Sequence, residues 1–243
     1  MIRVATWENA RAGRFARAEP FFHGHKTHFI VSEKDARPSP QAYLLEQAPG
    51  FSVQAHFHSV PQFQVVAGGS GRIGSEPVAP FAVHFTGAHS PYGPIVAGTD
   101  GLWYFSLRAT TNEGAFFMPE SRGELRRDVE KAQITVNAPA VSSGGPRGEL
   151  RSVACDTLFA PRRDGLAAWR MRLPPDAVMP SPESPIGGGR FYLVTGGEMQ
   201  LAGNALARLS VAWVSPQDEP VRIAAARDGA EVLVLQFPRD AIA

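Results

Sequence analysis

The stretch GFSVQAHFHSVPQFQVVAGG, residues 50–69, is the starting point for interpreting the chain. In it, His56 and His58 alternate with small or apolar residues. Side chains two residues apart point to the same face of a β-strand, so we expect both imidazoles on one face. Gln62 follows in a predicted turn, and a second apolar run ends at Gly69. The stretch therefore predicts two strands joined by a turn, with three polar groups available to a metal ion.

A repeat with a constant offset divides the chain into two similar halves. FQVVAGG, which begins at Phe63, matches FYLVTGG, which begins at Phe191, an offset of 191 − 63 = 128. Asp100-Gly101 matches Asp228-Gly229, and 228 − 100 is again 128. The unchanged offset predicts two copies of one β unit that align without a gap. No histidine lies in the second copy, so a metal site is expected in the first copy alone.

The composition is that of a globular protein built from short strands. Apolar residues make up 44% of the chain and charged residues 19%. The 24 Gly and 21 Pro favour many turns, which is typical of a β-sandwich or β-barrel. A net charge of +1 predicts no special attraction to nucleic acid or to anionic membranes. The lone Cys155 excludes an internal disulfide, and we find no signal peptide or transmembrane stretch, so we expect a cytoplasmic protein.

The motif in residues 50–69 resembles the first conserved motif of the cupin superfamily. That motif consists of Gly, five residues, His-x-His, three or four residues, Glu, six residues and Gly. Gly50, His56, His58 and Gly69 match its spacing, and Gln62 stands where the family has Glu. Together with the repeat, the resemblance implies a bicupin. The implied fold is all-β, with two tandem cupin-type antiparallel β-barrels (double-stranded β-helix, or jelly roll) and one short helix between them.

These patterns predict four parts along the chain. The helix is expected in FFMPESRGELRRDVEKAQ, where Glu120-Ser121 offers a start and ELRRDVEKA contains good helix formers. A linker, NAPAVSSGGPRGE, follows. The predicted parts are an N-terminal segment (1–40), a first cupin barrel with the candidate metal site (41–110), the helix and linker (111–149), and a second barrel without metal ligands (150–243).

The resemblance also implies a divalent metal ion (Fe, Mn, Ni or Zn) held by histidines and a carboxylate. An ungapped match to the second cupin motif puts Tyr92 where the family has its third histidine. His84 on the preceding strand and His89 in the turn are the alternatives, and we rank His84 first because a strand holds a ligand more rigidly. Tyr92 would then position the substrate or pass a proton. The metal ligands are predicted to come from His56, His58, Gln62, His84 and His89.

The exchange of Glu for Gln62 removes the one negative charge from the implied ligand set. A metal held by neutral ligands binds more weakly and is a stronger Lewis acid toward a bound anion. We therefore expect a metal-dependent cupin enzyme that acts on a small anionic molecule, with dioxygenase chemistry as the superfamily's commonest precedent. The alternatives are a non-catalytic bicupin that binds or senses a small molecule, and a storage-like structural protein. A homodimer is the expected assembly, without nucleic-acid or membrane partners.

Overall fold

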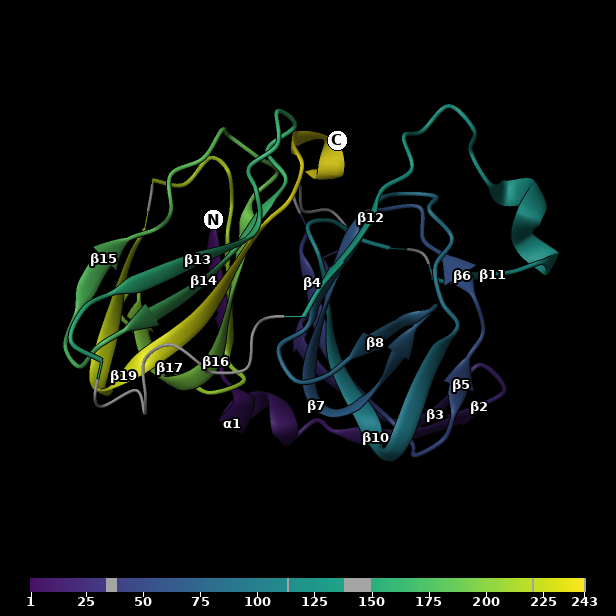
Figure 1. The fold of residues 1–243 in the computed structure, drawn as a ribbon, viewed down its shortest axis with the longest axis horizontal. Helices are drawn as coiled ribbons and strands as arrows, with labels where there is room; N and C mark the ends of the chain where they lie inside the picture. Colours follow the sequence, from purple (N-terminus) through teal and green to yellow (C-terminus); the bar gives the residue numbers. More distant parts are fainter. Residues whose placement is uncertain (34–38, 113, 138–149, 220, 243) are drawn as a thin grey trace. The chain divides into compact units, whose positions relative to one another are not determined.

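The computed structural model describes residues 1–33, 39–112, 114–137, 150–219 and 221–242, which form two compact units (Figure 1). The N-terminal unit is Arg11–Asn137. The C-terminal unit combines Met1–Ala10 with Ala138–Ala243. The predicted N-terminal segment is thus divided between the two units, because β1 (Ile2–Ala5) pairs with a strand of the C-terminal unit.

The N-terminal unit is built on an antiparallel nine-stranded sheet. Its order is β12-β9-β7-β10-β4-β3-β2, and β5 and β8 are attached to β10 and β7. The path does not return to its first strand, so the sheet is open rather than a closed barrel. A two-stranded sheet joins β6 to β11. The bounds are β2 (Phe15–Glu19), β3 (Phe22–Ile30), β4 (Gln41–Gln47), β5 (Ser52–Val53), β6 (His56–Phe57), β7 (Gln62–Ile73), β8 (Glu76–Val78), β9 (Val83–Thr86), β10 (Ile95–Arg108), β11 (Phe116–Phe117) and β12 (Gln133–Val136).

The C-terminal unit is built on an antiparallel eight-stranded sheet of related design. Its order is β1-β18-β16-β19-β14-β13, and β15 and β17 are attached to β19 and β16. This sheet is also open, so the all-β prediction is confirmed while the expected barrels are not closed. The remaining bounds are β13 (Ala154–Phe159), β14 (Ala167–Leu173), β15 (Val178–Pro180), β16 (Arg190–Leu201), β17 (Asn204–Ala207), β18 (Val211–Val214) and β19 (Arg222–Gln236).

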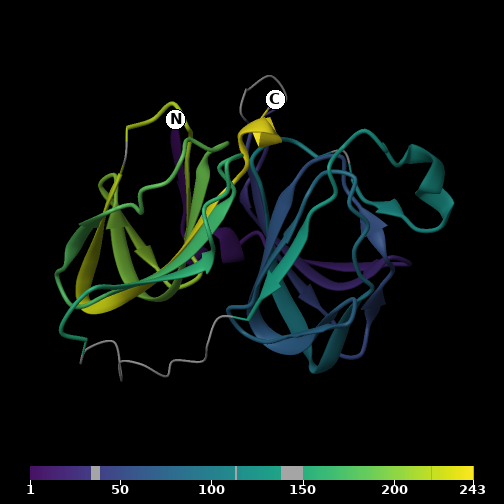
Figure 2. The same ribbon diagram turned by 45° about the horizontal axis from the view of Figure 1, so that its top comes forward.

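The predicted repeat is confirmed by the strand boundaries. Adding 128 to both ends of β7 gives the ends of β16, since 62 + 128 = 190 and 73 + 128 = 201. The same sum converts β9 into β18, since 83 + 128 = 211 and 86 + 128 = 214. In each unit the longest strands, β7 with β10 and β16 with β19, run side by side as an antiparallel pair (Figures 1 and 2).

The second glycine of the repeated Gly-Gly pair occupies a position where only glycine fits. Gly69 has φ +69° and its repeat equivalent Gly197 has φ +67°, the left-handed region that disfavours other residues. A Cβ on Gly69 would lie 2.1 Å from the carbonyl oxygen of Gly101, and one on Gly197 would lie 2.0 Å from that of Gly229. The register of the long strand pair shifts next to both glycines. The repeat therefore preserves a backbone contact within each sheet.

The predicted helix between the two halves is only a single 3-10 turn, η1 (Glu120–Glu124). It begins where expected, but Leu125 is already extended (φ −70°, ψ 118°), so ELRRDVEKA does not continue it. None of the η1 residues is buried, and a short helix without a packed face is marginal in water. The α-helix of the described residues is α1 (Trp7–Arg11), and no described helix has the length and apolar character needed to cross a membrane. A second 3-10 turn, η3 (Arg239–Ile242), lies at the other end of the chain.

Alternation along β10 separates the core from the site. Phe105 and Leu107 are fully buried on one face of this strand. Tyr104, Ser106 and Arg108 lie on the other face, where they line a cavity. The last residues of β10 therefore carry polar side chains into the interior of the N-terminal unit.

Candidate functional site

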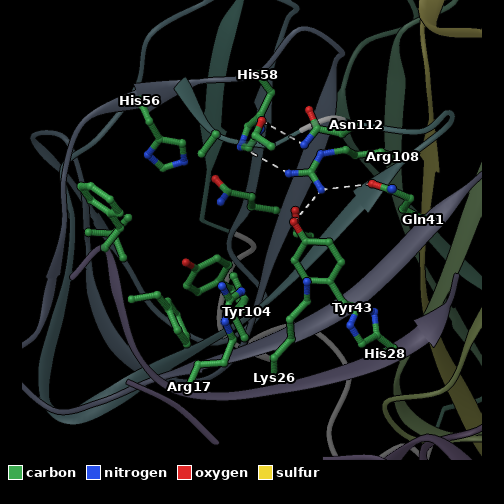
Figure 3. Close-up of a pocket in the computed structure, with 18 of the residues that line it drawn as sticks. Arg17, Lys26, His28, Gln41, Tyr43, His56, His58, Tyr104, Arg108 and Asn112 are labelled. Atoms are coloured by element: carbon green, nitrogen blue, oxygen red, sulfur yellow. Dashed lines mark hydrogen bonds between the residues drawn. The ribbon is translucent and has the colours of Figure 1, made fainter. Parts of the chain in front are cut away.

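A cavity of about 510 Å³ lies within the N-terminal unit (Figure 3). This volume falls in the range of small-molecule sites. Strands β2, β3, β4 and β10 form much of its wall, and aromatic residues such as Phe22 and Phe117 contribute an apolar surface. The polar lining includes Arg17, Lys26, Tyr43, His56, His58 and Arg108.

The two histidines of the motif are oriented alike. His56 Nδ1 lies 2.8 Å from the carbonyl oxygen of Gln54, and His58 Nδ1 lies 2.7 Å from that of Gly114. Because a carbonyl only accepts hydrogen bonds, Nδ1 carries the proton in both rings and Nε2 keeps its lone pair. The ring centroids are 5.2 Å apart, in agreement with the prediction that both imidazoles share one face.

Hydrogen-bond donors meet both of these Nε2 atoms. The Tyr92 hydroxyl lies 2.7 Å from His56 Nε2 and accepts a hydrogen bond of 2.5 Å from Gln62 Nε2. Nη2 of Arg108 donates to Gln62 Oε1 at 2.7 Å and lies 3.3 Å from His58 Nε2. The motif residues are thus linked into one network by Tyr92 and Arg108.

Arg108 is the central cation of the cavity. Its side chain is only 1% exposed. Its Nη1 donates to the Tyr43 hydroxyl at 2.5 Å and to Gln41 Oε1 at 3.5 Å, and Figure 3 shows the guanidinium between these two residues and His58. Every hydrogen-bond partner that the described residues give it is neutral, and Arg108 Nε is buried without a partner among them. Within the described part of the chain, this buried guanidinium therefore has no carboxylate hydrogen-bonded to it.

The protonation states follow from burial. Burial lowers the pKa of His56 to about 4, and burial with the nearby Arg108 charge lowers the pKa of His58 well below 6.5. Both rings are therefore neutral at pH 7. Burial raises the pKa of Tyr92, so its hydroxyl keeps its proton and donates it to His56.

The pKa of Tyr43 is shifted in the opposite direction from that of Tyr92. Burial raises the pKa of this phenol, but the charges of Arg108 and Lys26, together with hydrogen bonds from Ser106 and Arg108, outweigh burial and leave the pKa of Tyr43 below its ordinary value. Lys26 Nζ lies 3.9 Å from the centroid of the Tyr43 ring. This corner of the cavity therefore stabilises negative charge.

Two predicted ligands lie outside this network. His84 Nδ1 is 2.8 Å from Thr135 Oγ1 and its Nε2 is 2.7 Å from Thr86 Oγ1, so both ring nitrogens have hydroxyl partners. The His89 ring lies against Phe57, with centroids 5.5 Å apart, on the side of β6 away from the two inward histidines. Of the predicted site residues, His56, His58, Gln62 and Tyr92 share this hydrogen-bond network. His84 adjoins it only through its ring, whose centroid lies 5.5 Å from that of Tyr92, and His89 lies apart.

The described side chains, as arranged, do not fit a divalent metal ion. In the stretches that the structure describes, no three His, Cys, Asp or Glu side chains are grouped so that they could hold one. The groups of the motif that could ligate a metal are the imidazoles of His56 and His58 and the amide of Gln62, and all three are neutral. Arg108 is hydrogen-bonded to two of these side chains, His58 and Gln62. At an effective dielectric of about 20, a divalent ion about 4 Å from a guanidinium would be repelled by roughly 8 kcal/mol. A metal therefore requires Arg108 to move.

Three residues of the site were missed by the sequence reasoning: Lys26, Tyr43 and Arg108. A signal for Arg108 was present, because Tyr104, Ser106 and Arg108 alternate at the end of an otherwise apolar strand. Lys26 and Tyr43 come from β3 and β4. In the folded sheet β4 pairs with β10 and β3 pairs with β4, and this order is not visible in the sequence.

Comparison with known proteins identifies the fold. No protein-family model and no curated protein sequence matches the chain. Three solved structures, each 12–14% identical, resemble it over 98% of its length: the pirin YhhW from Escherichia coli in complex with nickel(II) (TM-score 0.58, 99% of that chain), oxalate decarboxylase from Bacillus subtilis, in a study of its Mn(II) centres (0.57, 77%), and the 11S allergen from Cocos nucifera (0.61, 89%). The chain has the bicupin fold, as the sequence predicted.

Proposed function

We propose that the N-terminal unit of this bicupin binds a small anionic molecule in the cavity beside Arg108. The observation that supports it is a buried guanidinium, 1% exposed, whose hydrogen-bond partners among the described residues are all neutral. Removing such a charge from water costs several kcal/mol unless an opposite charge compensates it. An anion in the cavity would supply that charge.

The rest of the lining agrees with an anionic ligand that has an apolar body. Arg17 forms an ion pair with Glu19, whereas Lys26 and Arg108 form no ion pair with any residue that the structure describes. Lys26 Nζ lies over the ring of Tyr43, the residue whose hydroxyl accepts a hydrogen bond from Arg108. Aromatic side chains such as Phe22 and Phe117 also line the cavity. A small carboxylate with a ring or short alkyl chain is the chemical class that matches this distribution.

A metal-dependent enzyme of dioxygenase type remains the second candidate. The inward Nε2 atoms of His56 and His58 favour it, because metal-binding histidines commonly anchor their other nitrogen in this way. The nickel and manganese of the pirin and the decarboxylase point in the same direction. Arg108 opposes it for the electrostatic reason given above.

Calorimetric titration with benzoate, acetate and malonate tests the proposed function, with benzamide as an uncharged analogue of benzoate. We expect at least one carboxylate to bind. Arg108→Gln should weaken that binding about tenfold or more, because a hydrogen bond to a charged group contributes about 1.5–3 kcal/mol. Arg72→Gln, at an exposed position of β7, is the matched control and should bind as the unaltered protein does. The proposal is wrong if no carboxylate binds, or if Arg108→Gln binds as tightly as the control.

A further inference from the structure

We infer that the guanidinium of Arg108 replaces the divalent metal ion of a cupin site, so that this site carries a covalently attached cation. The inference concerns what occupies the metal position, and it holds whether or not a carboxylate binds beside it.

The first support is the identity of the contacted atoms. A metal in this site would be ligated by Nε2 of His56, Nε2 of His58 and a side-chain oxygen at position 62. Arg108 Nη2 donates to two of these, Gln62 Oε1 at 2.7 Å and His58 Nε2 at 3.3 Å. The Tyr92 hydroxyl donates to the third, His56 Nε2, at 2.7 Å. Each inward lone pair is thus directed at a proton.

The second support is charge balance. A divalent ion with one carboxylate ligand carries a net charge of +1, and so does a guanidinium with a neutral amide. Glutamine at position 62 fits this exchange, because its Oε1 accepts from Arg108 and from Ser106 Oγ at 3.2 Å while its Nε2 donates to Tyr92. A carboxylate would accept at both oxygens and would have no proton for the Tyr92 hydroxyl. The residues at positions 62, 92 and 108 are therefore mutually consistent.

The third support comes from the other half of the chain. Adding 128 to Gln62 and Arg108 gives Arg190 and Gln236, the same two residue types with their places exchanged. Arg190 Nε donates to Gln236 Oε1 at 2.6 Å, close to the 2.7 Å of the first pair. The C-terminal unit contains no histidine at all. An Arg–Gln pair across the two long strands is therefore a feature of both copies and needs no metal ligands.

Metal uptake tests the inference. The purified protein and its variants are incubated with excess Ni(II) or Mn(II), desalted and analysed for bound metal. We expect less than about a tenth of an equivalent on the unaltered protein. The triple variant Gln62→Glu, Tyr92→His and Arg108→Leu restores the family ligands and removes the guanidinium, so it should retain about one equivalent. Arg190→Gln, in the unit without histidines, is the matched control and should take up none.

Two outcomes would overturn the inference. One is about one equivalent of metal on the unaltered protein that is lost in His56→Ala, because Arg108 would then coexist with the ion. The other is a triple variant that shows the melting transition and circular dichroism of a folded protein and yet retains no metal. If the triple variant does not fold, the single variant Arg108→Leu decides: metal uptake above that of the unaltered protein supports the inference, and unchanged uptake overturns it. The carboxylate titrations are separate measurements, so either proposal can fail alone.

Discussion

The close backbone contact at Gly69 leads to a stability prediction that can be worked out from the structure. Gly69→Ala places a Cβ 2.1 Å from the carbonyl oxygen of Gly101, whereas ordinary carbon–oxygen contacts are about 3.3 Å or longer. The strands β7 and β10 must therefore separate by about 1 Å. Residues other than glycine also lose roughly 1–2 kcal/mol in the left-handed region, and overpacking adds about 1–3 kcal/mol. We expect the free energy of unfolding to fall by roughly 3 kcal/mol.

Gly50→Ala separates the two contributions. Gly50 has φ +68°, almost the same as Gly69, but nothing lies within 4 Å of its Cβ position. Gly50→Ala should therefore lose only the conformational part of the stability, about 1–2 kcal/mol. The assay is urea denaturation followed by circular dichroism, with Gly197→Ala as the repeat equivalent that should resemble Gly69→Ala. Equal losses in Gly69→Ala and Gly50→Ala would refute the reasoning, because the interstrand contact would then contribute nothing.

Two further predictions concern buried ionisable groups. Burial lowers the pKa values of His56 and His84 to about 4 in the folded state, while the unfolded chain titrates near 6.5, so stability is complete above pH 6.5 and declines as the pH falls toward 4. The loss is roughly 3 kcal/mol per histidine, measurable by denaturation at pH 7 and pH 4.5, and a flat profile would contradict it. In the C-terminal unit, Arg170 Nη2 lies 2.9 Å from Glu231 Oε2, and both side chains are at most 5% exposed. Glu231→Ala should lose about 3–5 kcal/mol in urea denaturation, and replacing both residues by Leu and Met should lose less, whereas additive losses would contradict a paired charge.

Much of the fold follows from local pattern. Alternation predicts strands because it depends only on residues close in sequence. The 128-residue offset predicts equivalent strands in the two halves because the repeat can be found by aligning the sequence with itself. The strand β12 lies within the part of the chain predicted as helix and linker (111–149), so the sequence pattern does not reveal it. QITV is too short to identify a strand on its own, and its pairing with β9 is a tertiary contact.

The site likewise combines features that follow from local sequence with features that depend on tertiary pairing. His56 and His58 share a face because they are two residues apart, and this was predictable. The role of Arg108 depends on strand register, which places Leu107 opposite Phe63 and therefore Arg108 next to Gln62. A shift of one residue would turn Arg108 to the other face of the sheet. Register is fixed by the whole sheet, so the contact between Arg108 and the motif appears only in the folded structure.

The pairing of β1 with β18 has a consequence for cutting the protein into parts. Ile2 pairs with Val214 and Ala5 with Val211, so the first residues complete a sheet whose other strands come after residue 150. A protease that cleaves between residues 137 and 150 would produce two fragments that stay associated through backbone hydrogen bonds. A fragment of residues 150–243 alone would expose β18 as a bare edge, a template for aggregation. Adding a peptide of residues 1–10 should therefore solubilise that fragment by complementation.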